Sequence, residues 1–201
     1  MKQTLFLCII TLFSNVNAQN ADINLLDKIN NNATTNGVKT FGFITDTEPY
    51  VAIGTPLTVL SIGFIKMEKE TKWKGLEIAS SSIATSLIVT GLKLGISRDR
   101  PFVTYPDLIT QYTKAGSHSF PSGHTSSAFA TATSLSICYP KWYVIVPAYA
   151  YAGTIAYSRM YLGVHYPSDV LFGALIGTGT AIGTHFLFKK IKRNRQVSSK
   201  S

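Results

Sequence analysis

Long apolar stretches alternate with short polar connectors along the chain, and this alternation predicts a bundle of helices. A polar stretch rich in Asn and Thr, residues 19–48, comes first, and within it Ile23, Leu26 and Ile29 recur at helical spacing. They predict a short amphipathic helix before a loop, lying on the membrane surface or packed on the main bundle. Five apolar segments follow, at residues 50–65, 76–96, 126–139, 142–157 and 170–188. The expected fold class is therefore all-α.

The lengths of the apolar segments bear on whether they cross a membrane. A membrane span needs about 20 apolar residues. Segments 76–96 and 170–188 reach that length, whereas the other three are shorter and diluted by Ser, Thr, Gly and Tyr. The pattern predicts five membrane-spanning helices, and a soluble helical bundle is the alternative.

The first 18 residues have the pattern of an export signal. Lys2 supplies a positive start, residues 5–13 are apolar, and Val16-Asn17-Ala18 resembles a cleavage site for signal peptidase. The alternative is an uncleaved first membrane helix. In both cases the chain that follows is expected to start outside the cytoplasm.

The net charge of +9 and the pI of about 9.6 are compatible with binding to nucleic acid or to an anionic membrane. The distribution of the charge argues against nucleic acid. Basic residues gather in two short connectors and in the C-terminal tail of residues 189–201, between the apolar segments, a pattern typical of the cytoplasmic ends of membrane helices. These residues are Lys66, Lys69, Lys72, Lys74, Lys141, Lys189, Lys190, Lys192, Arg193, Arg195 and Lys200.

The same charges predict an orientation. If residue 19 lies outside, the connector 66–74, Lys141 and the basic tail all fall on the cytoplasmic side. The polar clusters around Lys93 and Arg159 then fall on the outer side. A soluble bundle gives no reason for this sorting. We therefore expect a bacterial inner-membrane protein whose polar clusters face the periplasm, with a soluble periplasmic protein as the alternative.

The tetrapeptide Pro121-Ser122-Gly123-His124 comes directly before an apolar helix. Ser122 is expected to cap that helix, and Gly123 permits close approach of the backbone. A helix start offers unpaired N–H groups and a partial positive charge, which suit a phosphate group. His124 would lie beside that phosphate.

A second cluster joins a cation, a histidine and a carboxylate. Arg159 ends one apolar segment, and His165 and Asp169 stand one helical turn apart at the start of the next, where Pro167 suits the first turn. Asp169 is expected to accept a hydrogen bond from one ring nitrogen of His165 and to leave the other nitrogen as a free lone pair. Such a histidine is a candidate nucleophile, and a His–Asp pair that only caps a helix is the alternative.

The third cluster is cationic. Lys93 and Arg100 flank a turn that contains Gly95, and Pro101 follows. Either cation could extend to the membrane interface or bind an anion. Arg98 has no place in the pattern and is expected at the interface.

Together the clusters resemble the type 2 phosphatidic acid phosphatase (PAP2) superfamily, which includes bacterial class A acid phosphatases and vanadium haloperoxidases. The resemblance spans about residues 92–170 and leaves the part before residue 48 uncovered. It implies a phosphatase domain at residues 49–188. The matching motifs are Lys93 with Arg100-Pro101, then Pro121-Ser122-Gly123-His124, then Ser158-Arg159 with His165 and Asp169.

The resemblance also implies a role for each matching residue. His165 would attack phosphorus and form a phosphohistidine, Asp169 would orient it, and His124 would protonate the leaving oxygen and then activate water. The remaining residues would bind the phosphoryl group: Lys93, Arg100 and Arg159 through their charge, and Ser122 and Gly123 as part of the cradle. No metal or other cofactor is implied, and no carboxylate cluster suited to Mg²⁺ lies near the motifs.

The expected substrate is a phosphate or diphosphate on a membrane lipid, such as phosphatidic acid, phosphatidylglycerophosphate, undecaprenyl diphosphate or lipid A. The loop of residues 102–120 is expected to cover the pocket. A secreted soluble acid phosphatase is the main alternative. The others are a vanadium haloperoxidase and a phospholipid-binding or structural membrane protein without activity.

Overall fold

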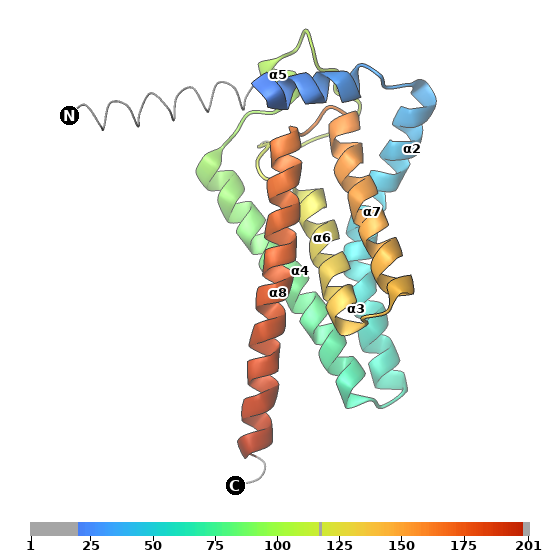
Figure 1. The fold of residues 1–201 in the computed structure, drawn as a ribbon, viewed down its shortest axis with the longest axis vertical. Coiled ribbons are helices and arrows are strands. Elements are labelled where there is room, and N and C mark those ends of the chain that lie inside the picture. The colour runs from blue at the N-terminus through green and yellow to red at the C-terminus, as the bar shows by residue number, and fades with distance from the viewer. Residues whose placement is uncertain (1–19, 117, 199–201) are drawn as a thin grey trace, which may run out of the picture.

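The computed structural model describes residues 20–116 and 118–198, and these residues form helices and loops without any strand. The all-α prediction is confirmed, while the expected export signal of residues 1–18 lies outside the described residues. Residues 20–30 are helical and lie across one end of a bundle of longer helices (Figure 1). The other helices are α2 (Thr35–Asp46), α3 (Glu48–Ile65), α4 (Lys69–Ile96), α5 (Pro101–Thr104), α6 (Gly123–Cys138), α7 (Trp142–Tyr161) and α8 (Pro167–Ser198).

The loop expected after the amphipathic helix is instead a second helix, α2. Thr34 caps it by accepting a hydrogen bond from the Gly37 N–H at 3.1 Å. Phe41 anchors it on α7, where its ring lies 4.7 Å from the ring of Tyr161 and 5.3 Å from that of Tyr157. Tertiary packing therefore makes this Asn- and Thr-rich stretch helical.

The amphipathic helix of residues 20–30 packs on the bundle, one of its two expected positions. Ile23 and Leu26 are buried in a cluster with Ile109 and Tyr166. At its end, the fully buried Asn30 side chain donates hydrogen bonds to the carbonyls of Thr110 and Tyr161 and accepts one from the Thr110 N–H. The helix thus covers the end of the bundle at which α8 begins.

Helix α6 lies at the centre of the bundle, in contact with α3, α4, α7 and α8. Its buried side chains are mostly Ala, Ser and Thr, which let the neighbouring helices come close. On α8, a Cβ atom on Gly173 would lie 2.9 Å from the Ser122 carbonyl oxygen, and one on Gly177 would overlap that of Ser126. This close contact fixes the start of α6 against the start of α8.

Three helical stretches are long and apolar enough to cross a membrane: Thr35–Ile65, Lys69–Thr104 and Pro167–Arg195. The prediction of five spans is thus supported for three stretches. Helix α6 has 16 residues, so it is about 24 Å long, shorter than a hydrocarbon core of about 30 Å. The short length of α6 and the Ser, Thr and Tyr residues of α6 and α7 distinguish these two helices from the three apolar stretches.

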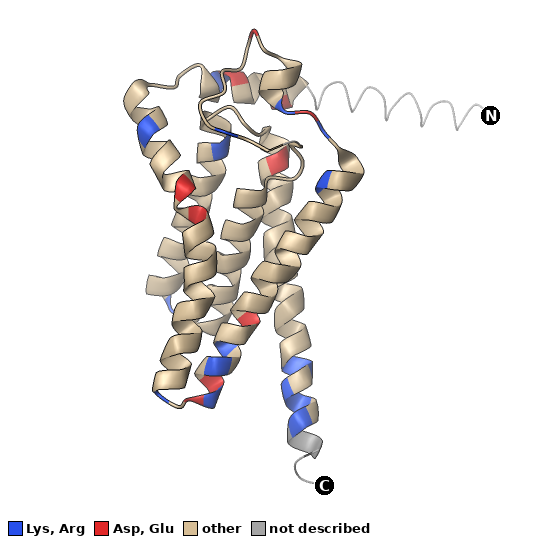
Figure 2. Ribbon diagram, turned by 180° about the vertical axis from the view of Figure 1, so that it is seen from behind, with Lys and Arg blue, Asp and Glu red and all other residues tan. Residues whose placement is uncertain are grey.

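Most of the Lys and Arg residues lie toward the two ends of the bundle (Figure 2). Lys and Arg gather at the turn between α3 and α4 and along the last turns of α8, which extends beyond the other helices (Figures 1 and 2). The motif cations lie toward the opposite end, where α4 stops and α8 starts. The arrangement matches the sorting of charge expected from the sequence.

Candidate active site

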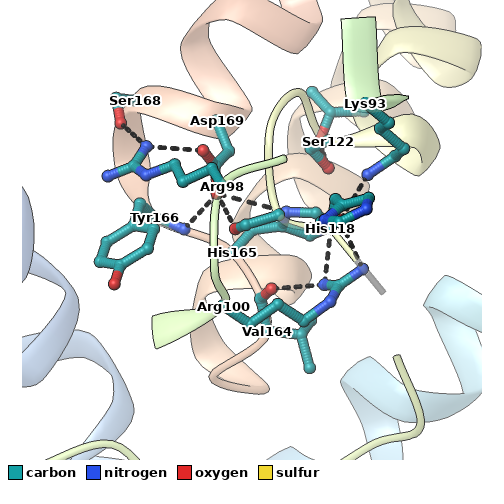
Figure 3. Close-up of polar contacts among 12 residues, drawn as sticks. Lys93, Arg98, Arg100, His118, Ser122, Val164, His165, Tyr166, Ser168 and Asp169 are labelled. Atoms are coloured by element: carbon teal, nitrogen blue, oxygen red, sulfur yellow. Dashed lines mark hydrogen bonds and ion pairs between the residues drawn. The ribbon is translucent and has the colours of Figure 1, made fainter. Parts of the chain in front are cut away.

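The three sequence clusters meet at one end of the bundle, although they are separated along the chain (Figure 3). Lys93 lies in the last turn of α4, Ser122 is the residue before α6, and Asp169 lies in the first turn of α8. Arg159 belongs to the last turn of α7, and His165 to the connection that follows. The bundle thus brings every predicted site residue to this end.

His165 and Asp169 form the predicted pair, and both are almost fully buried. The Nδ1 atom of His165 lies 3.4 Å from Oδ2 of Asp169, a long hydrogen bond. The same oxygen accepts hydrogen bonds from the Tyr166 N–H at 2.9 Å and from the Ser119 hydroxyl. Asp169 therefore caps the start of α8 and also holds the imidazole. The two alternatives, a helix-capping pair and a carboxylate that orients His165, are both compatible with this geometry.

The other ring nitrogen of His165, Nε2, lies 3.3 Å from Nη1 of Arg100. Burial lowers the pKa of His165 to about 4, and the positive charge of Arg100 acts in the same direction. The ring is therefore neutral near pH 7. With its proton on Nδ1 toward Asp169, the ring turns the lone pair of Nε2 toward Arg100, as a nucleophile for a bound anion requires.

Backbone carbonyls hold the cations Arg100 and Lys93 in place (Figure 3). Arg100, which is 5% exposed, donates from Nη1 to the Val164 carbonyl at 2.6 Å and from Nε to the Gly116 carbonyl at 2.7 Å. The His118 carbonyl accepts from Lys93 at 2.7 Å and from Arg100 at 3.1 Å. The loop expected to cover the pocket thus contacts the two cations through its backbone.

The Pro121–His124 segment forms the start of α6 as predicted, but Ser122 does not cap it in the expected way. The Ser122 hydroxyl lies 2.9 Å from that of Thr125 and makes no side-chain bond to a helix N–H. Ser122 thus occupies the predicted N-cap position, while its hydroxyl pairs with another hydroxyl of the first turn. The Ser122 N–H instead donates to the Asp169 carbonyl at 3.0 Å, which ties the start of α6 to α8.

Gly123 and His124 line a cavity of about 330 Å³ between α3, α4 and α6, with Lys93 at the same wall. The nearest atom to a Cβ on Gly123 would be 3.8 Å away, so the space beside this glycine is open. Burial lowers the pKa of His124 to about 3, reinforced by the surrounding cations, first among them Arg159. The start of α6 and the charge of Lys93 therefore make this end of the cavity positive, which favours an anion.

Arg159 is 4% exposed, and its side chain contacts the N-terminal part of the chain. Its Nη1 donates to the Thr45 hydroxyl of α2 at 2.9 Å, and its Nε has no hydrogen-bond partner among the described residues. Glu48, at the start of α3, is buried and lines the cavity that contains His124. Thr45, which lies before the matching motifs, therefore helps to hold the Arg159 side chain in place.

Arg98 is not an interfacial side chain, and that prediction was wrong. It donates from Nη1 to Oδ1 of Asp169 and to the Ser168 hydroxyl, both at 2.7 Å, and from Nη2 to Asp22 at 2.9 Å. Its guanidinium also lies 3.8 Å above the ring of Tyr166. Two carboxylates and an aromatic face stabilise this position more than water at a membrane surface would.

Sequence reasoning missed Asp22, Thr45, Glu48, Arg98 and Ser119 as parts of the site. These residues carry no common spacing, and each reaches the site only through the fold. Within residues 20–116 and 118–198, no three His, Cys, Asp or Glu residues group as metal ligands.

Comparison with known proteins places these features in a family. A family model described as PAP2 superfamily matches residues 74–193. The undecaprenyl-diphosphatase of Sulfolobus acidocaldarius is 31% identical over 159 residues, which are 79% of this chain and 73% of that protein. The lipid A 1-phosphatase of Rhizobium etli is 27% identical, and the match covers 59% of this chain and about half (52%) of that protein.

Two solved structures have a similar fold. The transmembrane PAP2-type phosphatidylglycerolphosphate phosphatase from Bacillus subtilis superposes with a TM-score of 0.76 at 25% identity, over 94% of this chain and 96% of that one. LpxE from Aquifex aeolicus gives a TM-score of 0.70 at 28% identity, over 82% and 94%. The resemblance drawn from the three motifs is confirmed: the chain belongs to the PAP2 superfamily.

Proposed function

We propose that this protein is a membrane lipid phosphatase that hydrolyses a phosphate monoester or diphosphate of a lipid through a phosphohistidine on His165. The observation that carries the proposal is the position of His165, whose Nδ1 faces Asp169 while Nε2 faces Arg100. A buried neutral imidazole in this orientation suits attack on an anion that the surrounding cations bind. Relatives named as phosphatases of lipid-linked phosphates support the substrate class.

In the first step, Lys93, Arg100 and Arg159 bind the phosphoryl oxygens, together with N–H groups at the start of α6 near Ser122 and Gly123. The lone pair of His165 Nε2 attacks phosphorus, and the P–N bond forms as the bond from phosphorus to the lipid oxygen breaks. Protonated His124 gives its proton to the leaving oxygen. Asp169 stabilises the positive charge that develops on the ring.

In the second step, water attacks the phosphohistidine and transfers a proton to His124, and the P–N bond breaks as inorganic phosphate forms. The pKa of about 3 makes His124 neutral in the empty pocket near pH 7. A bound phosphate dianion offsets the positive charge of the cations and so raises that pKa. The substrate itself would therefore place the acid in its protonated form.

The cavity beside His124 supports a lipid as the substrate. Its polar end carries Lys93 and His124, and its walls include the apolar side chains of Ala52, Ile53 and Val89 from α3 and α4. Ile53 is 62% exposed on the outside of the bundle, as expected of a side chain that contacts lipid. A phosphate at the polar end would place its lipid chain along α3 and α4.

We also propose that the bundle spans the inner membrane with all five long helices and presents the site to the periplasm. The gathering of basic residues at the opposite end supports this orientation. Large apolar side chains exposed on the long helices, among them Ile65, Leu87 and Leu171, argue against a secreted soluble phosphatase. In this arrangement residues 1–18 are a cleaved signal or a first membrane helix.

The test uses the full-length protein purified in detergent. Phosphatidic acid, phosphatidylglycerophosphate, undecaprenyl diphosphate and lipid A are assayed beside a water-soluble phenyl phosphate. We expect a higher kcat/KM for at least one lipid than for the soluble ester, and the protein should stay in the membrane pellet after a carbonate wash. Hydrolysis of the soluble ester alone, by a protein that leaves the pellet, would overturn the proposal in favour of a soluble acid phosphatase.

A further inference from the structure

A chain of charged groups runs from the N-terminal helix to His165. Asp22, in the helix of residues 20–30, accepts a hydrogen bond from Nη2 of Arg98 at 2.9 Å. Nη1 of Arg98 donates to Oδ1 of Asp169 at 2.7 Å, and Oδ2 of Asp169 faces His165. Figure 3 shows the Arg98 guanidinium between Ser168 and Asp169. The chain of contacts joins a segment outside the matched family region to the catalytic pair.

Asp22 also fixes the start of the helix that carries Asp169. Its Oδ1 accepts from the Ser168 N–H at 2.8 Å, and its Oδ2 accepts from the Ser168 hydroxyl. The side chain of Asp22 is 9% exposed, and that of Asp169 is fully buried. An acidic group supplied from another helix therefore satisfies one of the unpaired N–H groups in the first turn of α8.

The two oxygen atoms of Asp169 have separate partners. Oδ1 accepts a hydrogen bond from Arg98. Oδ2 accepts hydrogen bonds from the Ser119 hydroxyl and the Tyr166 N–H and faces Nδ1 of His165. A carboxylate held at Oδ1 by a planar guanidinium cannot rotate freely, so Oδ2 stays directed at Nδ1 of His165. Arg98 forms ion pairs with both Asp22 and Asp169, so its positive charge interacts with two carboxylates and not with Asp169 alone.

We propose that Asp22 and Arg98 are positioning residues of the phosphatase reaction, which orient Asp169 so that His165 keeps its proton on Nδ1 and its lone pair toward the bound phosphate. This inference rests on the proposed function. The N-terminal helix is, in this view, a part of the active site. The reaction step itself is unchanged, since neither residue contacts the phosphoryl group.

The experiment compares Asp22→Asn with Asp27→Asn in the full-length protein. Both residues belong to the N-terminal helix, and Asp27 bonds only to the exposed Asn31 side chain among the described side chains. Asp22→Asn can still accept from the Ser168 N–H but no longer offers a charged partner to Arg98. We expect a fall in kcat of about tenfold with little change in KM, because the phosphate-binding cations remain in place. Asp27→Asn should retain wild-type kinetics.

A double-mutant cycle distinguishes positioning from general stabilisation. If Asp22 acts through Arg98, Asp22→Asn should have little further effect on kcat in the Arg98→Gln background, whereas independent roles would give additive effects. The inference would be overturned if Asp22→Asn kept the wild-type kcat. It would also be overturned if that variant lost kcat, oxyanion binding and thermal stability to the same extent. If the wild-type protein releases no phosphate from any lipid, the proposed function fails instead, and that outcome is visible before any variant is compared.

Discussion

Nη1 of Arg100 lies 3.3 Å from Nε2 of His165, on the side of the imidazole that faces away from Asp169. In the proposed reaction, a phosphoryl oxygen bound to Arg100 would bring its phosphorus atom next to the lone pair of Nε2. The contact would thus join the two proposed operations, neutralising the phosphate and attacking it. Arg100 also donates to the Val164 carbonyl, so it fixes the backbone directly before His165.

Removing the nucleophile should stop the reaction while leaving the phosphate pocket intact. His165→Ala is expected to lower kcat by at least about 1,000-fold, because His165 is the group proposed to form the P–N bond. The rate of phosphate release in detergent measures this, and binding of vanadate by the same variant shows that the pocket has folded. His124→Ala should lower kcat comparably. Full activity in His165→Ala would rule out the nucleophile assignment.

Metal removal provides a separate test of the pocket. In the proposed site, Lys93, Arg100 and Arg159 would supply the positive charge that a divalent cation provides in other phosphatases. Treatment with EDTA is therefore expected to leave the rate of phosphate release unchanged, and vanadate should inhibit competitively by binding to the same cations. Loss of activity in EDTA that Mg²⁺ restores would contradict a site built from side chains alone.

Ser119 should matter for kcat although it lies in no motif. Its hydroxyl donates to Oδ2 of Asp169, the oxygen that faces His165. Ser119→Ala removes a hydrogen bond to a charged group, so we expect a fall in kcat of about tenfold with KM nearly unchanged. Ser136→Ala is the matched control, because the Ser136 hydroxyl bonds only to the Ala132 carbonyl within α6 among the described contacts. Equal kinetics in the two variants would contradict a role for Ser119 in holding Asp169.

Binding of a dianion should be accompanied by proton uptake at His124. The pKa of about 3 means that this histidine is neutral near pH 7 when the pocket holds no anion. A bound dianion raises the pKa, so the protonated fraction of His124 increases and the site takes up protons from the buffer. Calorimetric titration with tungstate in two buffers of different ionisation enthalpy measures the uptake.

The histidine variant serves as the control for that titration. His124→Ala should bind tungstate with no proton uptake, while Ser136→Ala should behave as the wild type. Uptake that persists in His124→Ala would place the titrating group elsewhere, and no uptake in the wild type would contradict the proposed acid.

The sequence was sufficient to predict the motif residues because each motif is local. His165 and Asp169 are one turn apart, and Ser122 to His124 are consecutive, so spacing alone brings them together at helix starts. Ser119 and Arg98 could not be found in the same way. Their partner Asp169 is 50 and 71 positions away along the chain, and only the packing of the segments after α4 and before α6 against the start of α8 makes those contacts.

The N-terminal part shows the same limit. Its Asn- and Thr-rich composition indicated a loop before residue 48, yet α2 forms there because Phe41 packs on Tyr157 and Tyr161 of α7. Thr45 then reaches Arg159 from this helix. Local propensity is a weak guide where an aromatic contact outweighs it.

Helix α8 has two glycine pairs, Gly173–Gly177 and Gly179–Gly183, and both have the spacing of a contact between helices. The pairs allow the effect of close helix packing on stability to be measured apart from the effect of glycine on the helix itself. Only the first pair contacts α6; a Cβ on Gly177 would overlap the Ser126 carbonyl, whereas one on Gly183 would meet no atom within 4 Å. Gly177→Ala is therefore expected to lower the free energy of unfolding by about 1–3 kcal/mol, by pushing α8 away from the start of α6. Gly183→Ala should be neutral or stabilise by up to about 1 kcal/mol, because alanine favours a helix. Thermal unfolding in detergent measures both variants, and equal stability would show that α6 and α8 can separate without cost.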